Sequence, residues 1–157
     1  MLEIFVDGDA CPVKDEVERV AGRHGLTVHI VSNGGLRPSR HPLVKQVTVA
    51  ASADAADDWI AEHAGEGDIV VTADIPLASR CLKKDVRVLG STGKPFTEDG
   101  IGMALGMREL KRHLRESTGN QTYNAGFTPK DRSRFLGALE NEIQSLRRKF
   151  ARQSLDR

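Results

Sequence analysis

Strand-like and helix-like patterns alternate along roughly the first ninety residues of the chain. Short runs rich in Val, Ile and Leu are apolar at successive positions, which is typical of strands buried on both faces. These runs predict five strands, at residues 2–6, 26–32, 43–50, 69–72 and 86–89. Between them, apolar residues recur at spacings of three and four, the pattern of a helix with one buried face. This alternation predicts parallel strands joined by helices, and therefore an α/β fold.

Three connecting helices are expected, and they begin at Pro12, near Ser52 and around Pro76. Proline suits the first turn of a helix, because its φ angle is already helical and its missing N–H costs nothing there. The predicted inward-facing residues are Val13, Val17, Val20 and His24 in the first helix, Ala56 and Ile60 in the second, and Leu77, Cys81 and Leu82 in the third. With right-handed crossovers, the sheet takes the order 3-2-1-4-5 and helices cover both faces, giving three α/β/α layers.

The C-terminal part, about residues 101–150, is predicted to be helical. A loop at 90–100 precedes a helix whose apolar face comprises Met103, Met107, Leu110 and Leu114, and a polar connector spans 117–127. Thr128 and Asp131 have the spacing of a helix cap, so the last helix is expected to begin there. Its apolar positions, 136, 139, 143, 146 and 150, form a stripe too short for a coiled coil, which favours packing on its own domain. We expect residues 1–157 to form a single domain, with the oligomeric state open.

Composition is that of an ordinary globular protein, with 39% hydrophobic and 29% charged residues. The net charge of +1 conceals an uneven distribution. Residues 1–100 carry 11 Lys and Arg against 16 Asp and Glu, whereas residues 101–157 carry 12 against 6. A basic C-terminal third beside an acidic body is compatible with a phosphate-binding surface next to a metal site, or with a solvated helix face.

The sequence also restricts where the protein works. The N-terminus reads as a strand rather than a basic leader, and no apolar run approaches the about 18 residues of a membrane span. Cys11 and Cys81 are far apart and lie in no Cys-x-x-Cys motif, so neither a disulfide framework nor a zinc site is expected. We expect a soluble cytoplasmic protein with no membrane partner. Cys11 has no evident His partner and is interpreted as an inert small residue.

Acidic residues occur where the predicted strands end. Functional groups in an open parallel sheet gather just beyond the carboxyl ends of the strands. Asp7 and Asp9 follow the first strand, Asp74 follows the fourth, and Asp57 lies near the start of a helix that begins at the same edge. Asp99 is in the loop after the fifth strand. Chain segments far apart in sequence thus bring carboxylates to one edge of the sheet.

Such a cluster predicts a divalent metal site. Neighbouring carboxylates repel one another unless a proton or a cation neutralises them. Mg²⁺ and Mn²⁺ prefer oxygen ligands, and either ion can activate water for phosphodiester hydrolysis. The expected metal ligands are Asp7, Asp57, Asp74 and Asp99, and the expected catalytic residues are Asp7, Asp9, Asp57 and Asp74.

Structural roles are the alternative for several of these acids. Asp9 has the position of a cap for the first helix, and Asp99 that of a cap for the helix after 100. Asp54 and Asp57 share a helix face and would also stabilise the helix dipole. For nucleic-acid contacts, we expect Arg37, Arg40 and Lys94, whose loops overhang the same edge of the sheet.

Four segments resemble the YaiI/YqxD family of bacterial proteins, which is regarded as PIN-like. They are Phe5-Val6-Asp7-Gly8-Asp9-Ala10-Cys11-Pro12, Asp54-Ala55-Ala56-Asp57, Val71-Thr72-Ala73-Asp74-Ile75-Pro76-Leu77-Ala78, and Asp131-Arg132 with Phe135-Leu136. The resemblance runs from residue 1 to about 150 and implies the three-layer fold of PIN domains, which are metal-dependent ribonucleases.

The resemblance also implies roles for individual residues. Asp7 resembles the PIN acid that ends the first strand, and Asp74 the acid after the fourth. Asp57 stands where PIN domains usually have a helical Glu, and Asp99 is a looser match for the fourth acid. The predicted partner is therefore nucleic acid, RNA in particular, and the predicted cofactor is Mg²⁺ or Mn²⁺.

Two other functions remain open at this stage. A strand that ends in Asp7-Gly8-Asp9 also resembles the start of haloacid-dehalogenase-type phosphatases. Those enzymes need a lysine near the site, and Lys83 falls about two turns into a helix. The other alternative is an RNA-binding or scaffold protein without catalytic activity, which would use the basic C-terminal third.

Overall fold

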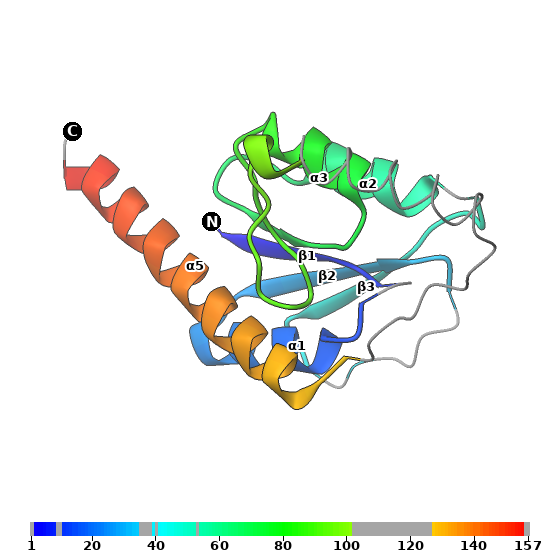
Figure 1. Ribbon diagram of the computed structural model, residues 1–157, viewed down its shortest axis with the longest axis horizontal. Helices are drawn as coiled ribbons and strands as arrows, with labels where there is room; N and C mark the ends of the chain where they lie inside the picture. Colours follow the sequence, from blue (N-terminus) through cyan, green and yellow to red (C-terminus); the bar gives the residue numbers. More distant parts are fainter. Residues whose placement is uncertain are drawn as a thin grey trace, which may run out of the picture.

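The computed structural model describes residues 2–8, 11–34, 39, 41–52, 54–101 and 127–155. Its centre is a five-stranded sheet in the order β3-β2-β1-β4-β5, and all neighbouring strands are parallel. The strands are β1 (Glu3–Asp7), β2 (Thr27–Ser32), β3 (Val44–Thr48), β4 (Ile69–Val71) and β5 (Arg87–Leu89). Each lies within one residue or two of its predicted range, and the predicted order is confirmed (Figure 1).

Helices α1 (Lys14–His24), α2 (Ala55–His63) and α3 (Ile75–Leu82) connect the strands. The first two begin later than the sequence predicts. Pro12 and Val13 form a turn instead, in which Val13 has φ −114° and ψ 25°. Gly25 ends α1 in the left-handed conformation, with φ 66°, which glycine adopts without a Cβ clash.

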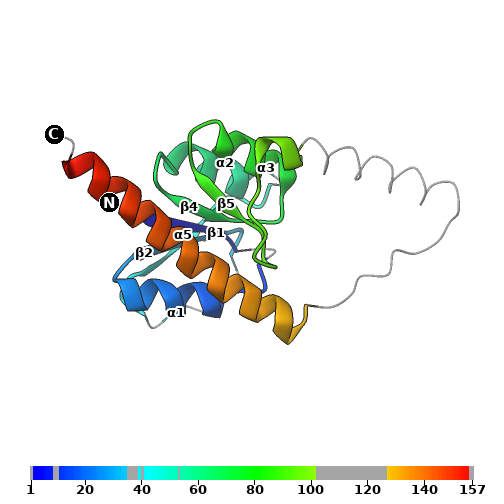
Figure 2. The ribbon, with the colours of Figure 1, turned by 60° about the vertical axis from the view of Figure 1, so that its left-hand side comes forward.

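Two layers of helices cover the sheet. Helices α2 and α3 lie over one face, and α1 with α5 (Pro129–Leu155) lies over the other (Figures 1 and 2). The strand residues alternate accordingly: Ile4 and Val6 contact the cluster of α1 and α5, and Phe5 contacts that of α2 and α3. Because both faces are covered, β1 is apolar at successive positions, as its sequence predicts.

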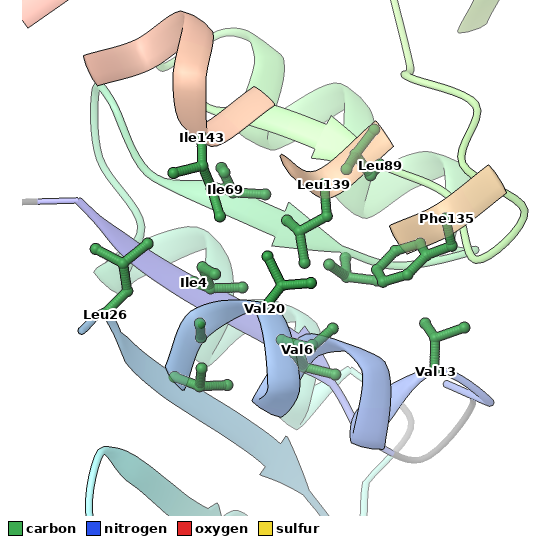
Figure 3. Packing of buried hydrophobic residues seen from close by; sticks show 14 of the residues in the cluster. Ile4, Val6, Val13, Val20, Leu26, Ile69, Leu89, Phe135, Leu139 and Ile143 are labelled. Atoms are coloured by element: carbon green, nitrogen blue, oxygen red, sulfur yellow. The ribbon is translucent and has the colours of Figure 1, made fainter. Parts of the chain in front are cut away.

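The last helix is anchored on the domain itself. Thr128 and Asp131 form the predicted cap: Asp131 N donates to Thr128 Oγ1 (3.1 Å) and Thr128 N donates to Asp131 Oδ2 (3.0 Å). Phe135, Leu139 and Ile143 are fully buried against α1 and strands β4 and β5 (Figure 3). Of the predicted stripe, Leu139, Ile143 and Leu146 are buried, and Leu136 and Phe150 are partly buried against the same cluster. The prediction that the stripe packs on its own domain is therefore confirmed, although it did not include Phe135.

Some predictions fall outside the described residues. These are the helix with Met103, Met107, Leu110 and Leu114, most of the connector at 117–127, and the site candidates Asp9, Arg37 and Arg40. Over the part of the chain that is described, no helix is long and apolar enough to cross a membrane.

Candidate functional site

The carboxyl edge of the sheet brings together side chains from β1 and from the segment after β4. These two strands are neighbours, with Val6 paired to Val71. Thr72 Oγ1 donates a hydrogen bond to Asp7 Oδ2 (3.2 Å) and accepts one from the backbone N–H of Asp74 (3.0 Å). Thr72 is only 3% exposed, so its hydroxyl links the two segments at a fixed place. Asp7 and Asp74 thus lie on either side of one buried threonine.

Asp74 also caps helix α3. Its Oδ1 accepts the backbone N–H of Leu77 (2.8 Å), the hydrogen bond expected of an N-cap residue. That bond fixes the orientation of the carboxylate. For Asp9 and Asp99, the sequence offers helix capping as the alternative to a functional role. In the structure, Asp74, which follows β4, has such a capping role.

Asp57 faces the same edge from α2. Burial, the largest cause, and the negative charges of Asp74, Asp7 and Asp54 together raise the pKa of Asp57 to about 6, although the nearby Arg80 partly opposes them. A carboxyl group responds in this way when other carboxylates are near and water is partly excluded. The structure therefore brings Asp57 into the electrostatic neighbourhood of Asp7 and Asp74. Their roles in catalysis and metal binding stay predictions.

The remaining acids lie at the margin of this group. Asp54 is exposed at the N-cap position of α2, without a capping hydrogen bond from its side chain. Asp58 is exposed and forms an ion pair with Arg80 (2.8 Å). Asp99 is exposed in the helical turn at residues 98–101, which Thr97 caps, since Thr97 Oγ1 accepts the N–H of Gly100 (2.9 Å). Asp99 does not cap this turn, and its predicted metal role stays untested.

The donor chemistry suits a hard divalent cation, since Asp7, Asp57 and Asp74 offer carboxylate oxygens and repel one another. Within the described ranges, no three His, Cys, Asp or Glu side chains are placed to hold one ion together. Mg²⁺ commonly uses one or two direct carboxylates and keeps several waters, so a ready-made cage is not required. The donor chemistry is therefore compatible with an ion held by one or two of these acids, and the metal site stays a prediction.

Two polar residues near this edge were not picked out by the sequence. Thr72 was interpreted only as part of a strand end, because threonine is common in strands. Lys14, the first residue of α1, donates from Nζ to the carbonyl oxygen of Gly8 (2.8 Å), directly after Asp7. It places a cation next to the residue that follows Asp7. A lysine in a first helical turn opposes the helix dipole, and that was the one signal available in the sequence.

The structure also describes Cys11, Lys94 and Lys83, three further residues for which the sequence predicts a role. Cys11 is buried, and burial raises the pKa of its thiol to about 11, which suits the inert role predicted for it. Lys94 is exposed in the loop after β5. Lys83 follows the last residue of α3, at the end of that helix opposite to Asp74, so it is badly placed for phosphatase chemistry.

These features define an α/β/α protein whose parallel sheet has several carboxylates at its C-terminal edge. The family model described as an uncharacterized BCR, the YaiI/YqxD family, matches residues 5–145. The chain belongs to this family.

Relatives from several bacteria are similar to this chain over almost their whole length. A UPF0178 protein of Parvibaculum lavamentivorans is 61% identical over 149 residues, which cover 95% of this chain and 98% of the relative. A UPF0178 protein of Rhodospirillum rubrum is 58% identical over 148 residues, covering 94% and 99%. No solved structure gives a significant match.

Proposed function

We propose that the protein is a Mg²⁺- or Mn²⁺-dependent nuclease that hydrolyses phosphodiester bonds in RNA. The observation that carries this proposal is the group of Asp7, Asp57 and Asp74, which come from three different elements and lie close enough for their charges to interact. Such an arrangement of carboxylates opposes stability unless it binds something positive, so a function is its simplest explanation.

The three carboxylates have different tasks in this proposal. Asp7 is oriented by the hydroxyl of Thr72, and Asp74 by the N–H of Leu77. Each hydrogen bond holds a carboxylate oxygen in place, so both acids have a defined orientation in which to hold a metal ion. Asp57, whose pKa is about 6, is mostly ionised near pH 7 yet basic enough to accept a proton from an attacking water. We assign the proton transfer to Asp57 and metal binding chiefly to Asp7 and Asp74.

A bound Mg²⁺ or Mn²⁺ ion would polarise the phosphate and lower the pKa of a water molecule bound to the ion. The chain itself supplies orientation and positive charge. Lys14 bonds to the carbonyl of Gly8, the residue after Asp7, and Lys94 is exposed on the loop after β5. Cations at these places favour an anionic backbone over a neutral substrate. RNA is preferred because of the resemblance to PIN-like ribonucleases.

Cleavage of a labelled, mixed-sequence single-stranded RNA tests the proposal. Purified protein is incubated with the RNA in EDTA, in Mg²⁺ and in Mn²⁺, and the products are separated on a denaturing gel. We expect cleavage only with metal, and a loss of about 100-fold or more in Asp7→Asn and Asp74→Asn, the scale of removing a group that acts in the transition state.

Glu62→Gln is the matched control. Glu62 is an exposed acid on α2, the helix that carries Asp57, and its substitution removes the same charge without touching the site. Cleavage that survives EDTA, or that falls equally in Glu62→Gln, contradicts the proposal. RNA binding without cleavage under all three conditions would favour the non-catalytic alternative.

A further inference from the structure

The loop after β5 borders a hollow that lies beside the three acids Asp7, Asp57 and Asp74. The hollow has a volume of about 370 Å³, and its lining includes Ala73 and Ile75, the two neighbours of Asp74 in the chain. Its other wall is formed by the loop itself, including Lys94 and Phe96. It therefore opens at the same edge of the sheet as the candidate site. Its volume lies at the lower end of the range for small-molecule pockets, about 300–1,000 Å³.

The loop is held in place by its own backbone and by α5. Gly90 N donates to Lys94 O (2.9 Å), Gly93 N donates to Gly90 O (3.0 Å), and Phe96 N donates to Val88 O (2.9 Å). Gly93 has φ +87°, and a Cβ there would lie 2.7 Å from the carbonyl oxygen of Arg134 in α5.

Figure 2 shows this loop descending from β5 toward α5. Only glycine allows the approach of Gly93 to the helix. The hollow is thus formed before any ligand binds, which lowers the entropy cost of binding.

The side chains of the hollow match the parts of a nucleotide. Phe96 is partly buried and contributes an aromatic ring, on which a planar base can stack. Ser91 and Thr92 contribute hydroxyl groups, and Lys94 is an exposed cation for a phosphate. A base within a duplex reaches such a hollow only if it is extruded from the stack, whereas a base in a single strand reaches it at little cost.

We propose that this hollow binds one nucleotide of single-stranded RNA, with its base against Phe96 and its phosphate beside Lys94, next to the carboxylates. The inference rests on the proposed function, since it names the subsite that presents the scissile strand. The hollow would select single strands over duplexes and set any preference for one base over another.

The test measures binding apart from cleavage. A fluorescein-labelled ten-nucleotide RNA of mixed sequence is titrated with the full chain in EDTA, and fluorescence anisotropy reports binding. The same RNA annealed to its complement serves as the duplex probe. Phe96→Leu keeps apolar bulk but removes the ring, and Lys94→Gln removes the charge. Lys83→Gln is the matched control, an exposed lysine at the opposite end of α3. Thermal melts confirm that each variant is folded.

We expect Phe96→Leu to weaken single-strand binding at least fivefold, the low end for loss of one stacked base. Lys94→Gln should weaken binding and reduce the slope of log K against log salt by about 0.7, the value for one phosphate contact to a single strand. Lys83→Gln should bind like the unmodified protein, and the duplex should bind more weakly than the single strand.

The outcomes separate this inference from the proposed function. If RNA binding depends on Phe96 and Lys94 but no metal-dependent cleavage occurs, the hollow binds a nucleotide and the proposed nuclease activity is excluded. If the protein cleaves RNA but Kd and KM are unchanged in both variants, the nucleotide-binding role of the hollow is excluded and the proposed nuclease activity is retained. Equal affinity for duplex and single strand, or no binding by the unmodified protein, also overturns the inference.

Discussion

Replacing Asp57 with asparagine should stabilise the metal-free protein, and the gain should grow as the pH rises from about 4 to about 6. The pKa of Asp57 rises from 3.8 to about 6 on folding, with burial as the main cause and the charges of Asp74 and Asp7 next. The folded state therefore binds this proton more tightly than the unfolded state does. Stability is lost as the pH rises from about 4 to about 6, and the full cost remains at higher pH.

The magnitude follows from the shift after allowance for solvent. One pKa unit corresponds to about 1.4 kcal/mol, so a shift of this size would set an upper limit near 3 kcal/mol. Asp57 is only partly buried, and water screens exposed charges strongly, so we expect about 1 kcal/mol. For a chain of this length, that free energy corresponds to a rise of about 2–4 °C in melting temperature.

Thermal melts in EDTA at pH 4.5 and at pH 7.5 measure this effect. Asp57→Asn should melt about 2–4 °C above the unmodified protein at pH 7.5, and the difference should be clearly smaller at pH 4.5. Glu62→Gln, which removes an exposed charge from the same helix, should show neither effect. Excess Mn²⁺ should reverse the order at pH 7.5, because the unmodified site gains more from the ion. Equal melting temperatures of Asp57→Asn and the unmodified protein at both pH values in EDTA would refute the reasoning.

Three further changes test other parts of the structure. Asp74→Asn should fold normally, because asparagine caps helices as well as aspartate, but should gain much less melting temperature from Mn²⁺; an equal gain would exclude Asp74 as a ligand. Thr128→Ala removes the hydroxyl that accepts the N–H of Asp131 and should cost about 1 kcal/mol in urea unfolding, with Ser133→Ala as the control on an exposed position of the same helix. Cys11 and Cys81 are buried, and burial raises both thiol pKa values to about 11, so a thiol reagent at pH 8 should label the folded protein far more slowly than the urea-unfolded one; similar rates would contradict their burial.

The sheet was predictable because its sequence signals are local and agree with one another. Successive apolar residues in β1 and β4 indicate burial on both faces, and right-handed crossovers leave few possible strand orders. Helix starts were less accurate. A proline at position 12 suits a first helical turn, but here it belongs to a turn that precedes α1, and the sequence pattern is the same in both cases.

The site was predictable only as a set of positions. The sequence places Asp7 and Asp74 at strand ends, but whether an acid caps a helix or lies in a site depends on its tertiary neighbours. The raised pKa of Asp57 is such a property, since its causes are burial and charges on other elements. Thr72 escaped notice for the same reason: a β-branched residue is expected there in any strand, and its hydrogen bond to Asp7 joins residues 65 apart in sequence.

Capping and metal binding need not compete at this edge of the sheet. The N–H of Leu77 and the hydroxyl of Thr72 donate to carboxylate oxygens of Asp74 and Asp7, so each bond restricts the rotation of its acid. A carboxylate that is already oriented needs less reorganisation to bind a cation. Burial and acidic neighbours raise the pKa of Asp57 to about 6, which suits the role of proton acceptor that we propose for it. In the proposed function, the contacts at the ends of β1 and β4 thus orient Asp7 and Asp74 as the two ligands, and Asp57 acts as the base.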